Sequence, residues 1–307
     1  KWFVEHKIMS IKITSSGAFG KGYSIELANN KKFHLKISKG RENVPATKRE
    51  FELFLKLKHP NIMKEIDAIK VDSIGALNLK TNILINTPVK SQIPYVIILS
   101  ELFEGTIDKK RFNNIVDIYK FMIVILEALY YINKMKITHQ DIKENNIGYY
   151  TIDGQIFYKL FDFGISSELT LEEGGKVNRI TNYLTMPIQY SMTPGYFPEG
   201  DSVISEKVDI YSLGVVLNKL LTTSKFVLEQ PEAHKNITKM IKLLIKKMNA
   251  QEITERSSIL GTLDILNNIF HFFPVTDKYN IIKYLQTNYE QEVEYDSSAI
   301  YEKAKLP

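Results

Sequence analysis

The stretch Ile137-Thr-His-Gln-Asp-Ile-Lys-Glu-Asn-Asn146 predicts more about this chain than any other. Asp141 follows His139 by two positions, Lys143 comes two further on, and Asn146 three beyond that. This order of groups suits a loop that directs a hydroxyl and a metal ion at once. Asp141 would accept a proton, and Asn146 would bind a divalent cation. The stretch therefore predicts half of a phosphoryl-transfer site.

The other half follows at Phe161-Asp-Phe-Gly164, in which Asp162 comes 21 residues after the first aspartate. Between the two lie the apolar runs Ile147–Tyr150 and Ile156–Phe161, separated by Asp153-Gly154. An Asp-Gly pair flanked by two such runs predicts a β-hairpin. The hairpin would return the chain to its start and bring Asp162 beside the asparagine of the loop. Two hard oxygen ligands would then meet at one Mg²⁺ site.

The two motifs, His139-x-Asp141-x-Lys143-x-x-Asn146 and Asp162-Phe163-Gly164, resemble the catalytic loop and the metal-binding motif of eukaryotic-type protein kinases. The resemblance covers roughly residues 10–272. It implies an α+β, bilobal protein-kinase-like fold. The expected parts are a β-rich N-terminal lobe over 1–100, a hinge over 101–104, a mainly helical C-terminal lobe over 105–273, and a helical and acidic extension over 274–307.

Composition agrees with such a fold and excludes several other classes. The chain has 307 residues, 44% of them hydrophobic, which is enough for a sizeable core. No apolar run reaches the length of a membrane span. The net charge of +5 is mild and dispersed, so binding to nucleic acid is not expected. The absence of cysteine excludes disulfides and fits a cytoplasmic protein, in the cytoplasm of a host cell if the chain is a pathogen effector. Lys1 in place of Met suggests a processed or trimmed sequence.

A phosphate-binding loop is expected near the N-terminus, in Ser15-Ser-Gly-Ala-Phe-Gly20. It interrupts two strand-like segments, and its small residues would let backbone amides approach a phosphate. Phe19 could close the tip over the phosphate. The pattern resembles the Gly-rich loop of kinases, with Ser15 in the place of the first glycine and with Gly17 and Gly20 kept. Without its position in the chain, a bare hairpin turn would explain it equally well.

Lys36 lies in the otherwise apolar strand segment Phe33–Ile37. A lysine on a strand is usually only a solvated side chain. Here a partner can be named on the following helix, expected within Lys48–Lys64 and ended by Pro60 of a His-Pro-Asn-Ile motif. Counting back from that motif, the family's helix glutamate falls on Glu50, with Glu52 as the other register. An ion pair with Glu50 would orient the lysine toward the α- and β-phosphates of ATP.

The resemblance assigns the adenine edge of ATP to the backbone of Glu101 and Phe103, which leave the buried strand Tyr95–Ser100. The residue that guards the pocket behind the base would be Ser100, or Leu99 if the register shifts by one.

The substrate side of the site is expected in the segment after Asp-Phe-Gly. Ile165–Met192 is polar and would be a surface loop or, by resemblance, an activation segment. Its end, Thr193–Glu199, resembles the kinase substrate motif with one residue fewer. Thr193 would hydrogen-bond near Asp141 and Lys143. A lysine at that place favours Ser and Thr acceptors over Tyr.

Gln140 stands where the family frequently has an arginine before the catalytic aspartate. Without that cation a phosphorylated loop would lose its usual anchor, so activity is expected to be independent of loop phosphorylation.

Asp209 is the charged residue of the apolar run Val208–Val216, where it needs a partner. By resemblance it ties down the backbone of the catalytic loop, and Arg256 pairs with Glu199. Further helices are expected over three ranges: Ile115–Lys134, Ile237–Met248 and Asp277–Tyr289. Val71–Pro94 has the length of an insertion.

The resemblance thus implies a serine/threonine protein kinase that uses ATP and Mg²⁺, with Mn²⁺ as a possible substitute. Asp141 would deprotonate the substrate hydroxyl, and Lys143 would neutralise charge on the γ-phosphoryl group. Asn146 and Asp162 would hold the metal, and Lys36 would anchor the phosphates.

Three departures concern the adenine pocket, where Gly22, His34 and Gly148 replace the usual valine, alanine and leucine. They imply a wider pocket and weaker nucleotide binding, or a local error of register. With Ser15 and Gln140, they leave open a kinase-like scaffold with weak or absent catalysis. A small-molecule or lipid kinase of related fold is a further alternative, but it leaves the aspartate in the apolar run and the substrate motif unexplained.

Overall fold

A computed structural model describes most of the chain. Several expectations lie outside the described residues, namely those on Phe19, Glu199 and the acidic end 291–307, most of the insertion 71–94 and most of 165–192. The described residues are 8–17, 20–38, 44–71, 77–78, 83–84, 95–110, 112–171, 177–180, 193–198 and 205–290.

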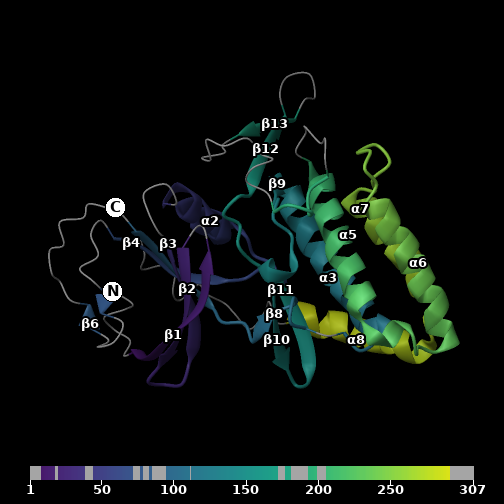
Figure 1. The fold of residues 1–307 in the computed structure, drawn as a ribbon, viewed down its shortest axis with the longest axis horizontal. Helices are drawn as coiled ribbons and strands as arrows, with labels where there is room; N and C mark the ends of the chain where they lie inside the picture. The colour runs from purple at the N-terminus through teal and green to yellow at the C-terminus, as the bar shows by residue number, and fades with distance from the viewer. Residues whose placement is uncertain are drawn as a thin grey trace.

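The N-terminal part is a five-stranded antiparallel sheet in the order β1-β2-β3-β7-β4, seen on the left of Figure 1. Its strands are β1 Ile8–Gly17, β2 Gly20–Leu27, β3 Lys32–Ser38, β4 Glu65–Val71 and β7 Tyr95–Glu101. The insertion contributes two short paired strands, β5 Leu77–Asn78 and β6 Ile83–Leu84.

Alternation along these strands separates two faces of the sheet. One face carries a small hydrophobic core of its own, formed by Tyr23, Ile25, Leu35, Ile97 and Leu99. On the opposite face, Lys36 pairs with Gly22 of β2, and His34 pairs with Ser100 of β7. Of the two candidate registers behind the adenine pocket, Ser100 therefore shares the face of Lys36.

Helix α2, Val44–Lys56, packs against this sheet. The expected helix extended to Pro60, but the structure ends it at Lys56, where the Leu57 backbone N–H still donates to the Leu53 carbonyl. A residue before proline is disfavoured in the α region, so the helix unwinds ahead of His59. Leu53 and Phe54 are buried, whereas Leu55 and Lys56 face solvent.

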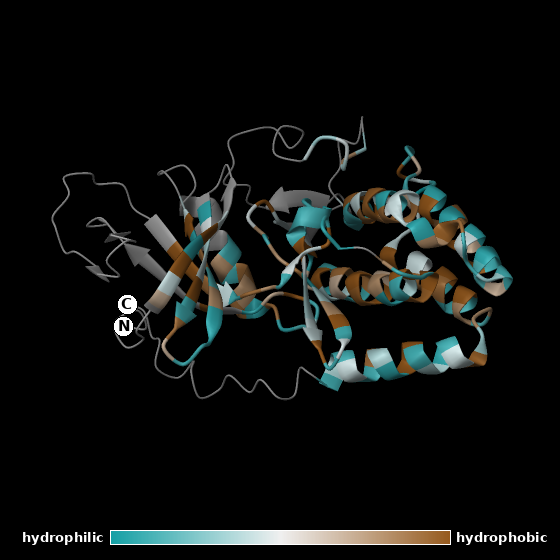
Figure 2. Cartoon of the chain, turned by 60° about the horizontal axis from the view of Figure 1, so that its bottom comes forward, coloured by the Kyte–Doolittle hydropathy of each residue, from teal (hydrophilic) through white to brown (hydrophobic). Residues whose placement is uncertain are grey.

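The C-terminal part is built around α3, whose bounds, Ile115–Lys134, are those expected from the sequence. Its N-terminus is capped by Asn114, whose side chain accepts from the Asp117 N–H at 2.8 Å. Most of α3 is buried by its neighbours, and hydrophobic residues run along the helices of this part in Figure 2. The other helices are α5 Glu206–Thr223, α6 Glu232–Met248, α7 Ile259–Phe270 and α8 Val275–Glu290, with 3₁₀ turns at Glu144–Asn146 and Lys225–Val227.

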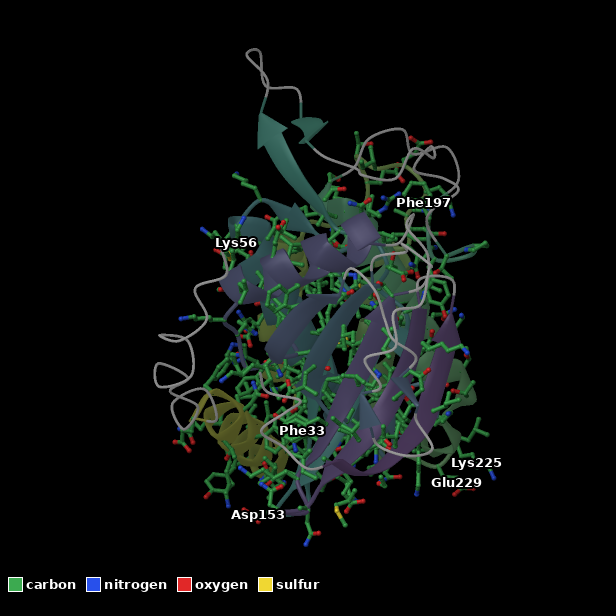
Figure 3. The ribbon with its side chains drawn as sticks, turned by 90° about the vertical axis from the view of Figure 1, so that its left-hand side faces the viewer. Phe33, Lys56, Asp153, Phe197, Lys225 and Glu229 are labelled. Carbon is green, nitrogen blue, oxygen red and sulfur yellow. The ribbon has the colours of Figure 1, made fainter. Side chains whose placement is uncertain are left out.

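The predicted hairpin between the two motifs is confirmed. Strand β10, Ile147–Ile152, pairs with β11, Gln155–Leu160, and the short strand β8, Gly105–Thr106, joins their sheet. Asp153 and Gly154 have φ angles of 49° and 76°, as a type I′ turn requires. Asp153 lies at one end of the molecule, far from Phe197 of the substrate motif (Figure 3). The open end of the hairpin, rather than its turn, therefore faces the site.

The segment after Asp-Phe-Gly was expected to be a loop, but its described residues form strands. Strand β12, Ser167–Leu171, pairs with β13, Val177–Ile180, and also with β9, Ile137–Thr138, which precedes the catalytic loop. The start of the segment is thereby tied to the loop.

Helix α8 joins the core of the C-terminal part instead of leaving it. Tyr284 stacks on Phe157 with ring centroids 5.5 Å apart. Near its end, Asn288 exchanges two hydrogen bonds with Asn61 of the His-Pro-Asn motif, at 2.8 and 2.9 Å. Both amides are buried, and Asn61 also donates to the Tyr158 carbonyl. The last described helix thus connects β11 with the turn that follows α2.

We expect Asn288→Ala to lower the free energy of unfolding by about 1–3 kcal/mol, because it leaves the buried amide of Asn61 without its partner. Urea denaturation followed by circular dichroism measures the change. Asn267→Ala, at an exposed position on α7, is the matched control and should stay within about 0.5 kcal/mol of the wild type. Equal loss in the two variants would show that the amide pair adds nothing.

Candidate active site

The expected catalytic residues meet in one hydrogen-bonded cluster. The Thr193 hydroxyl donates to Asp141 Oδ1 at 2.6 Å, and Lys143 Nζ donates to Asp141 Oδ2 at 2.7 Å. Lys143 also reaches Thr193 Oγ1 at 3.0 Å, and Asn146 Nδ2 donates to Asp141 Oδ2 at 2.8 Å. The Asp141 carboxylate is therefore held from three sides, with a hydroxyl directly on one of its oxygens.

Asp209 of α5 holds the backbone of the catalytic loop. Its Oδ2 accepts from the His139 N–H and its Oδ1 from the Gln140 N–H, both at 2.8 Å. Gln140 has a φ of 68°, a left-handed conformation that costs free energy for a residue with a side chain. Burial raises the pKa of Asp209 to about 7, although the two N–H donors favour its charged form. The expected role of Asp209 as a tie is seen directly in these bonds.

His139 connects the two motifs, a role that the sequence reasoning did not assign. Its Nδ1 accepts from the Asp141 N–H at 3.3 Å, so Nε2 carries the proton and donates to the Phe161 carbonyl at 3.1 Å. The ring lies 4.5 Å from that of Phe163, and burial lowers its pKa. A fully buried, neutral imidazole thus fixes the catalytic loop against the Asp-Phe-Gly segment. The position of His139 two residues before Asp141 is the feature of the sequence that could have indicated this role.

Lys36 bridges the two parts of the chain. Its Nζ lies 2.6 Å from Glu50 Oε2 and 2.9 Å from Asp162 Oδ1. Burial opposes its charge, but the carboxylates of Asp162 and Glu50 outweigh this and raise its pKa. Burial raises the pKa of Glu50 to about 7, whereas Lys36 holds that of Asp162 below its usual value against the effect of burial. Of the two registers, Glu50 is the partner, and Glu52 faces solvent.

Phe163 makes a further contact between the Asp-Phe-Gly segment and α2, the helix that carries Glu50. It is fully buried, and its ring meets Phe54 of α2 edge-on with centroids 5.0 Å apart. Asp162 adopts a φ of 64°, so its carboxylate and the Phe163 ring leave the backbone toward different partners. The helix is therefore held by an aromatic contact as well as by Lys36.

The two residues expected to bind a divalent metal are Asn146 and Asp162. The hairpin brings them together, since the Phe161 N–H donates to the Asn146 carbonyl at 3.1 Å. Among the described residues no group of three or more His, Cys, Asp or Glu side chains could hold a metal. An amide oxygen with one carboxylate instead suits a hard cation that keeps water and phosphate oxygens as further ligands, as Mg²⁺ does.

The phosphate loop is described only in its backbone. Ser15 and Gly17 lie in β1 and Gly20 in β2, and Gly17 pairs with Gly20 on either side of the tip, which is outside the described residues. The described ends of the loop therefore pair within the β1–β2 hairpin, and β2 in turn pairs with β3, which carries Lys36.

The segment expected to be the hinge, residues 101–104, is held in place by the side chain of Glu101. Its carboxylate accepts from Lys159 Nζ at 2.9 Å on both oxygens and from the Lys64 N–H at 2.7 Å. The expectation for Glu101 concerned only its backbone. The side chain additionally ties the segment to β11 and to Lys64, the residue directly before β4.

The glycine at position 148 suggested a wider adenine pocket. In the structure, an aromatic ring from the hinge segment fills the space beside this glycine. A Cβ at Gly148 would lie 2.3 Å from the Phe103 ring, so that ring occupies the space of a side chain. Phe103 also packs on Phe161, with ring centroids 5.3 Å apart. An aromatic ring from the hinge thus covers the β10 backbone.

The motifs indicate a particular protein family, and a comparison with family models identifies it. The model described as protein kinase domain matches residues 10–289, nearly the whole described chain. The chain belongs to the protein kinase family.

Several curated proteins are similar to this kinase domain. Calcium-dependent protein kinase 4 of Plasmodium falciparum is 27% identical over 268 residues, covering 78% of this chain and 45% of the relative. Myosin light chain kinase 2 of Oryctolagus cuniculus is 27% identical over 168 residues, covering 52% of this chain and 25% of the relative. A probable LRR receptor-like serine/threonine-protein kinase, MEE39 of Arabidopsis thaliana, is 28% identical over 42% of this chain and 14% of its own length. The chain thus spans less than half of each of these relatives.

The substrate motif of the kinase domain is anchored by contacts that sequence reasoning missed. The Tyr196 hydroxyl donates to Glu144 in the catalytic loop, and Lys219 of α5 donates to the same hydroxyl at 2.6 Å. Lys219 Nζ also lies 4.0 Å from the centre of the Tyr196 ring. Ser212 donates to the Tyr196 carbonyl at 2.6 Å. No spacing rule in the sequence links these residues.

Arg256 is buried in the C-terminal part of the kinase domain, but its expected partner Glu199 is outside the described residues. Its guanidinium donates to the carbonyls of Ala250 and Gln251, both at 2.9 Å, and lies 5.1 Å from the Tyr211 ring centre. These contacts fix the end of α6 to α5. In the described part of the kinase domain, no helix is long and apolar enough to span a membrane.

We expect the contribution of His34 and His59 to the stability of the kinase domain to fall as the pH falls from about 6.5 to 4. Burial lowers the pKa of His34 and of His59 to about 4, so the folded state stays neutral while the unfolded chain already binds protons. The loss would reach at most roughly 3 kcal/mol for each histidine at the lower pH. Unfolding free energies of wild type and His34→Gln across this range measure it. The unfolding free energy of His34→Gln should rise relative to that of the wild type as the pH falls, whereas the difference between exposed His271→Gln and the wild type should stay constant.

Proposed function

We propose that this chain is an ATP- and Mg²⁺-dependent serine/threonine protein kinase, in which Mn²⁺ could replace Mg²⁺. The proposal rests on one observation: the catalytic loop connects two clusters of polar side chains. Asp141, Lys143 and Thr193 form the first, and Lys36 with its two carboxylates forms the second. His139 connects them through Asp141 and Phe161.

Asp141 is the group that would take the proton of the acceptor hydroxyl. Thr193 shows the contact required, since its own hydroxyl donates to the Asp141 carboxylate at 2.6 Å. Lys143 and Asn146 donate to the other oxygen, and this orients the carboxylate and leaves Oδ1 for a hydroxyl. An incoming Ser or Thr would take the place of the Thr193 hydroxyl or share Oδ1 with it.

Lys36, Asn146 and Asp162 are the residues that would receive the phosphates and the metal. ATP with Mg²⁺ supplies the transferable γ-phosphoryl group and neutralises its charge. Lys36 is already directed toward Asp162 by Glu50, and the Asn146 amide oxygen and the Asp162 carboxylate supply hard ligands. The contribution of these side chains is positioning and electrostatic stabilisation rather than covalent chemistry.

The choice of Ser and Thr rests on Lys143, which contacts both the Asp141 carboxylate and the Thr193 hydroxyl. One relative, the probable LRR receptor-like protein of Arabidopsis thaliana, is named a serine/threonine-protein kinase, which agrees with this choice.

We expect transfer of labelled phosphate from ATP with Mg²⁺ to the protein itself or to a generic basic protein. Asp141→Asn and Asp162→Asn should each lower the rate by at least about a hundredfold, because they remove the base and a metal ligand. Asp264→Asn, exposed on α7, is the matched control and should keep the rate. Label must appear on Ser or Thr. A folded protein that transfers nothing would instead support a kinase-like scaffold.

We also expect activity without phosphorylation of the segment 165–192. Gln140 is the buried residue before Asp141 and offers no positive charge for a phosphate. The rate of a phosphatase-treated sample, checked by mass spectrometry, should equal that of the untreated sample. Abolished activity after this treatment would contradict the expectation without affecting the assignment of the catalytic residues.

A further inference from the structure

Helix α6 carries much of the positive charge of this chain. The net charge of +5 was expected to be dispersed, but this helix alone has five lysines and one glutamate. The buried residues of α6 lie along one side of the helix and pack into the C-terminal part: Ile237, Thr238, Ile241, Leu244, Ile245 and Met248. The lysines therefore lie on the side of the helix that faces solvent.

Four of these lysines form a stripe along the exposed side of α6. They occur at steps of four, three and four residues, the spacing of neighbours on one helix face, and are Lys235, Lys239, Lys242 and Lys246. At a rise of 1.5 Å per residue the lysine stripe is about 16 Å long. Lys235 pairs with Glu232 at 2.8 Å. Within the part of the chain that the structure describes, the other three form no ion pair, and neither does Lys247.

A hollow lies at the C-terminal end of the lysine stripe. It has a volume of about 410 Å³ and is lined by six residues: Leu243, Lys246, Lys247, Asn249, Ala250 and Glu255. Leu243 is apolar but 69% exposed, and three lysines of α6 lie one helical turn away from it. An apolar side chain surrounded by ammonium groups suits a partner that brings both an apolar group and negative charge.

Three kinds of anionic partner could meet this surface, and its residues favour one of them. A membrane is flat and would need several exposed apolar side chains in one plane, whereas Leu243 is the only exposed large one on α6. Single-stranded nucleic acid is bound through aromatic rings as well as charge, and α6 has no aromatic residue. Glu255 lines the hollow and would repel a phosphate or a carboxylate inside it. An apolar side chain of a protein fits there instead.

We propose that α6 is a docking site for an acidic segment of a partner protein. An apolar side chain of the segment would enter the hollow against Leu243, and its carboxylates would lie along the lysine stripe. The length of the stripe, about 16 Å, matches about five residues of an extended segment, in which alternate side chains face the same way. Because lysines bind as point charges, the segment needs negative charge and one apolar anchor rather than a fixed sequence.

The docking site lies apart from the catalytic residues. In Figure 1, α6 forms the outer edge of the C-terminal part on the right, whereas the five-stranded sheet lies on the left. A bound segment would therefore leave the acceptor site at Asp141 open. Docking does not require phosphoryl transfer, so a failure of this proposal and a failure of the proposed function are separate results.

Fluorescence anisotropy with a labelled acidic peptide and the whole chain tests the proposal. The probe has about twelve residues, with a central leucine and with alternating glutamate and serine on both sides. We expect the probe to bind, and to bind at least about tenfold more weakly when its glutamates are replaced by glutamine or when the salt concentration is raised from about 0.05 to 0.5 M. Failure of the folded chain to bind the probe at about 1 mM would overturn the proposal.

Lysine variants assign the binding to α6. The first variant combines three changes in the lysine stripe: Lys239→Gln, Lys242→Gln and Lys246→Gln. It should weaken binding of the probe at least about tenfold. The matched control changes three exposed lysines elsewhere in the chain: Lys31→Gln, Lys109→Gln and Lys283→Gln. It removes the same charge and should stay within about twofold of the wild type. Equal weakening by the two variants would show that only net charge matters and would overturn the proposal.

The hollow and the kind of partner are tested separately. Leu243→Ser should weaken the probe several-fold, whereas Leu55→Ser, at an exposed position on α2, should not. An unchanged constant for Leu243→Ser would overturn the placement of the apolar side chain. Vesicles containing phosphatidylserine and a single-stranded DNA oligonucleotide are the alternative probes. If either one binds more tightly than the acidic peptide, and loses this binding in the variant of the lysine stripe, the proposal of a protein partner is overturned.

Discussion

The contact of Lys36 with Glu50 and Asp162 is the interaction on which the arrangement of the site depends. It joins a strand, a helix and a loop that lie up to 126 residues apart in the chain. Two carboxylates face one ammonium group, so the cluster has an excess of negative charge in a buried setting. Burial raises the pKa of Glu50 and the nearby Asp162 carboxylate adds to this, while the two carboxylates raise the pKa of Lys36 against the effect of burial. A divalent cation on Asp162 would turn this excess of one negative charge into an excess of one positive charge, which favours anionic phosphates, so the ion pair and the metal site are best understood as one electrostatic unit.

Two strained backbone positions show how the surrounding structure holds this unit. Gln140 and Asp162 both have positive φ, which costs on the order of 1–3 kcal/mol for a residue with a side chain. Asp209 accepts the Gln140 N–H, and Lys36 binds the Asp162 carboxylate, so each strained residue has a charged partner. Charge-assisted hydrogen bonds of this kind are stronger than neutral ones and can offset the strain. The catalytic geometry is therefore maintained by buried charges on α5 and β3.

Much of this could be expected from the sequence, because the decisive contacts follow from local spacing. The hairpin between the two motifs, the full extent of α3 and the tie from Asp209 each depend on a pattern within about 20 residues or on a buried charge that needs a partner. Phe103 over Gly148 could not be foreseen, since a glycine in a sequence does not show which ring fills its space. The contact of Tyr196 with Glu144 was missed for the same reason. Side chains that meet only through tertiary packing leave no period in the sequence.

The C-terminal helix, α8, shows the same limit. Its amphipathic pattern predicts a helix, but nothing in it indicates that Asn288 would meet Asn61. Asn61 follows the end of α2, and α2 carries Glu50, so the amide pair fixes one end of the segment that orients Lys36. Phe163 fixes the same helix from the side of the catalytic loop. Because a buried amide without a partner is costly, α8 cannot leave this position without disturbing the turn after α2. The geometry of Lys36 thus depends on packing from both ends of the described chain.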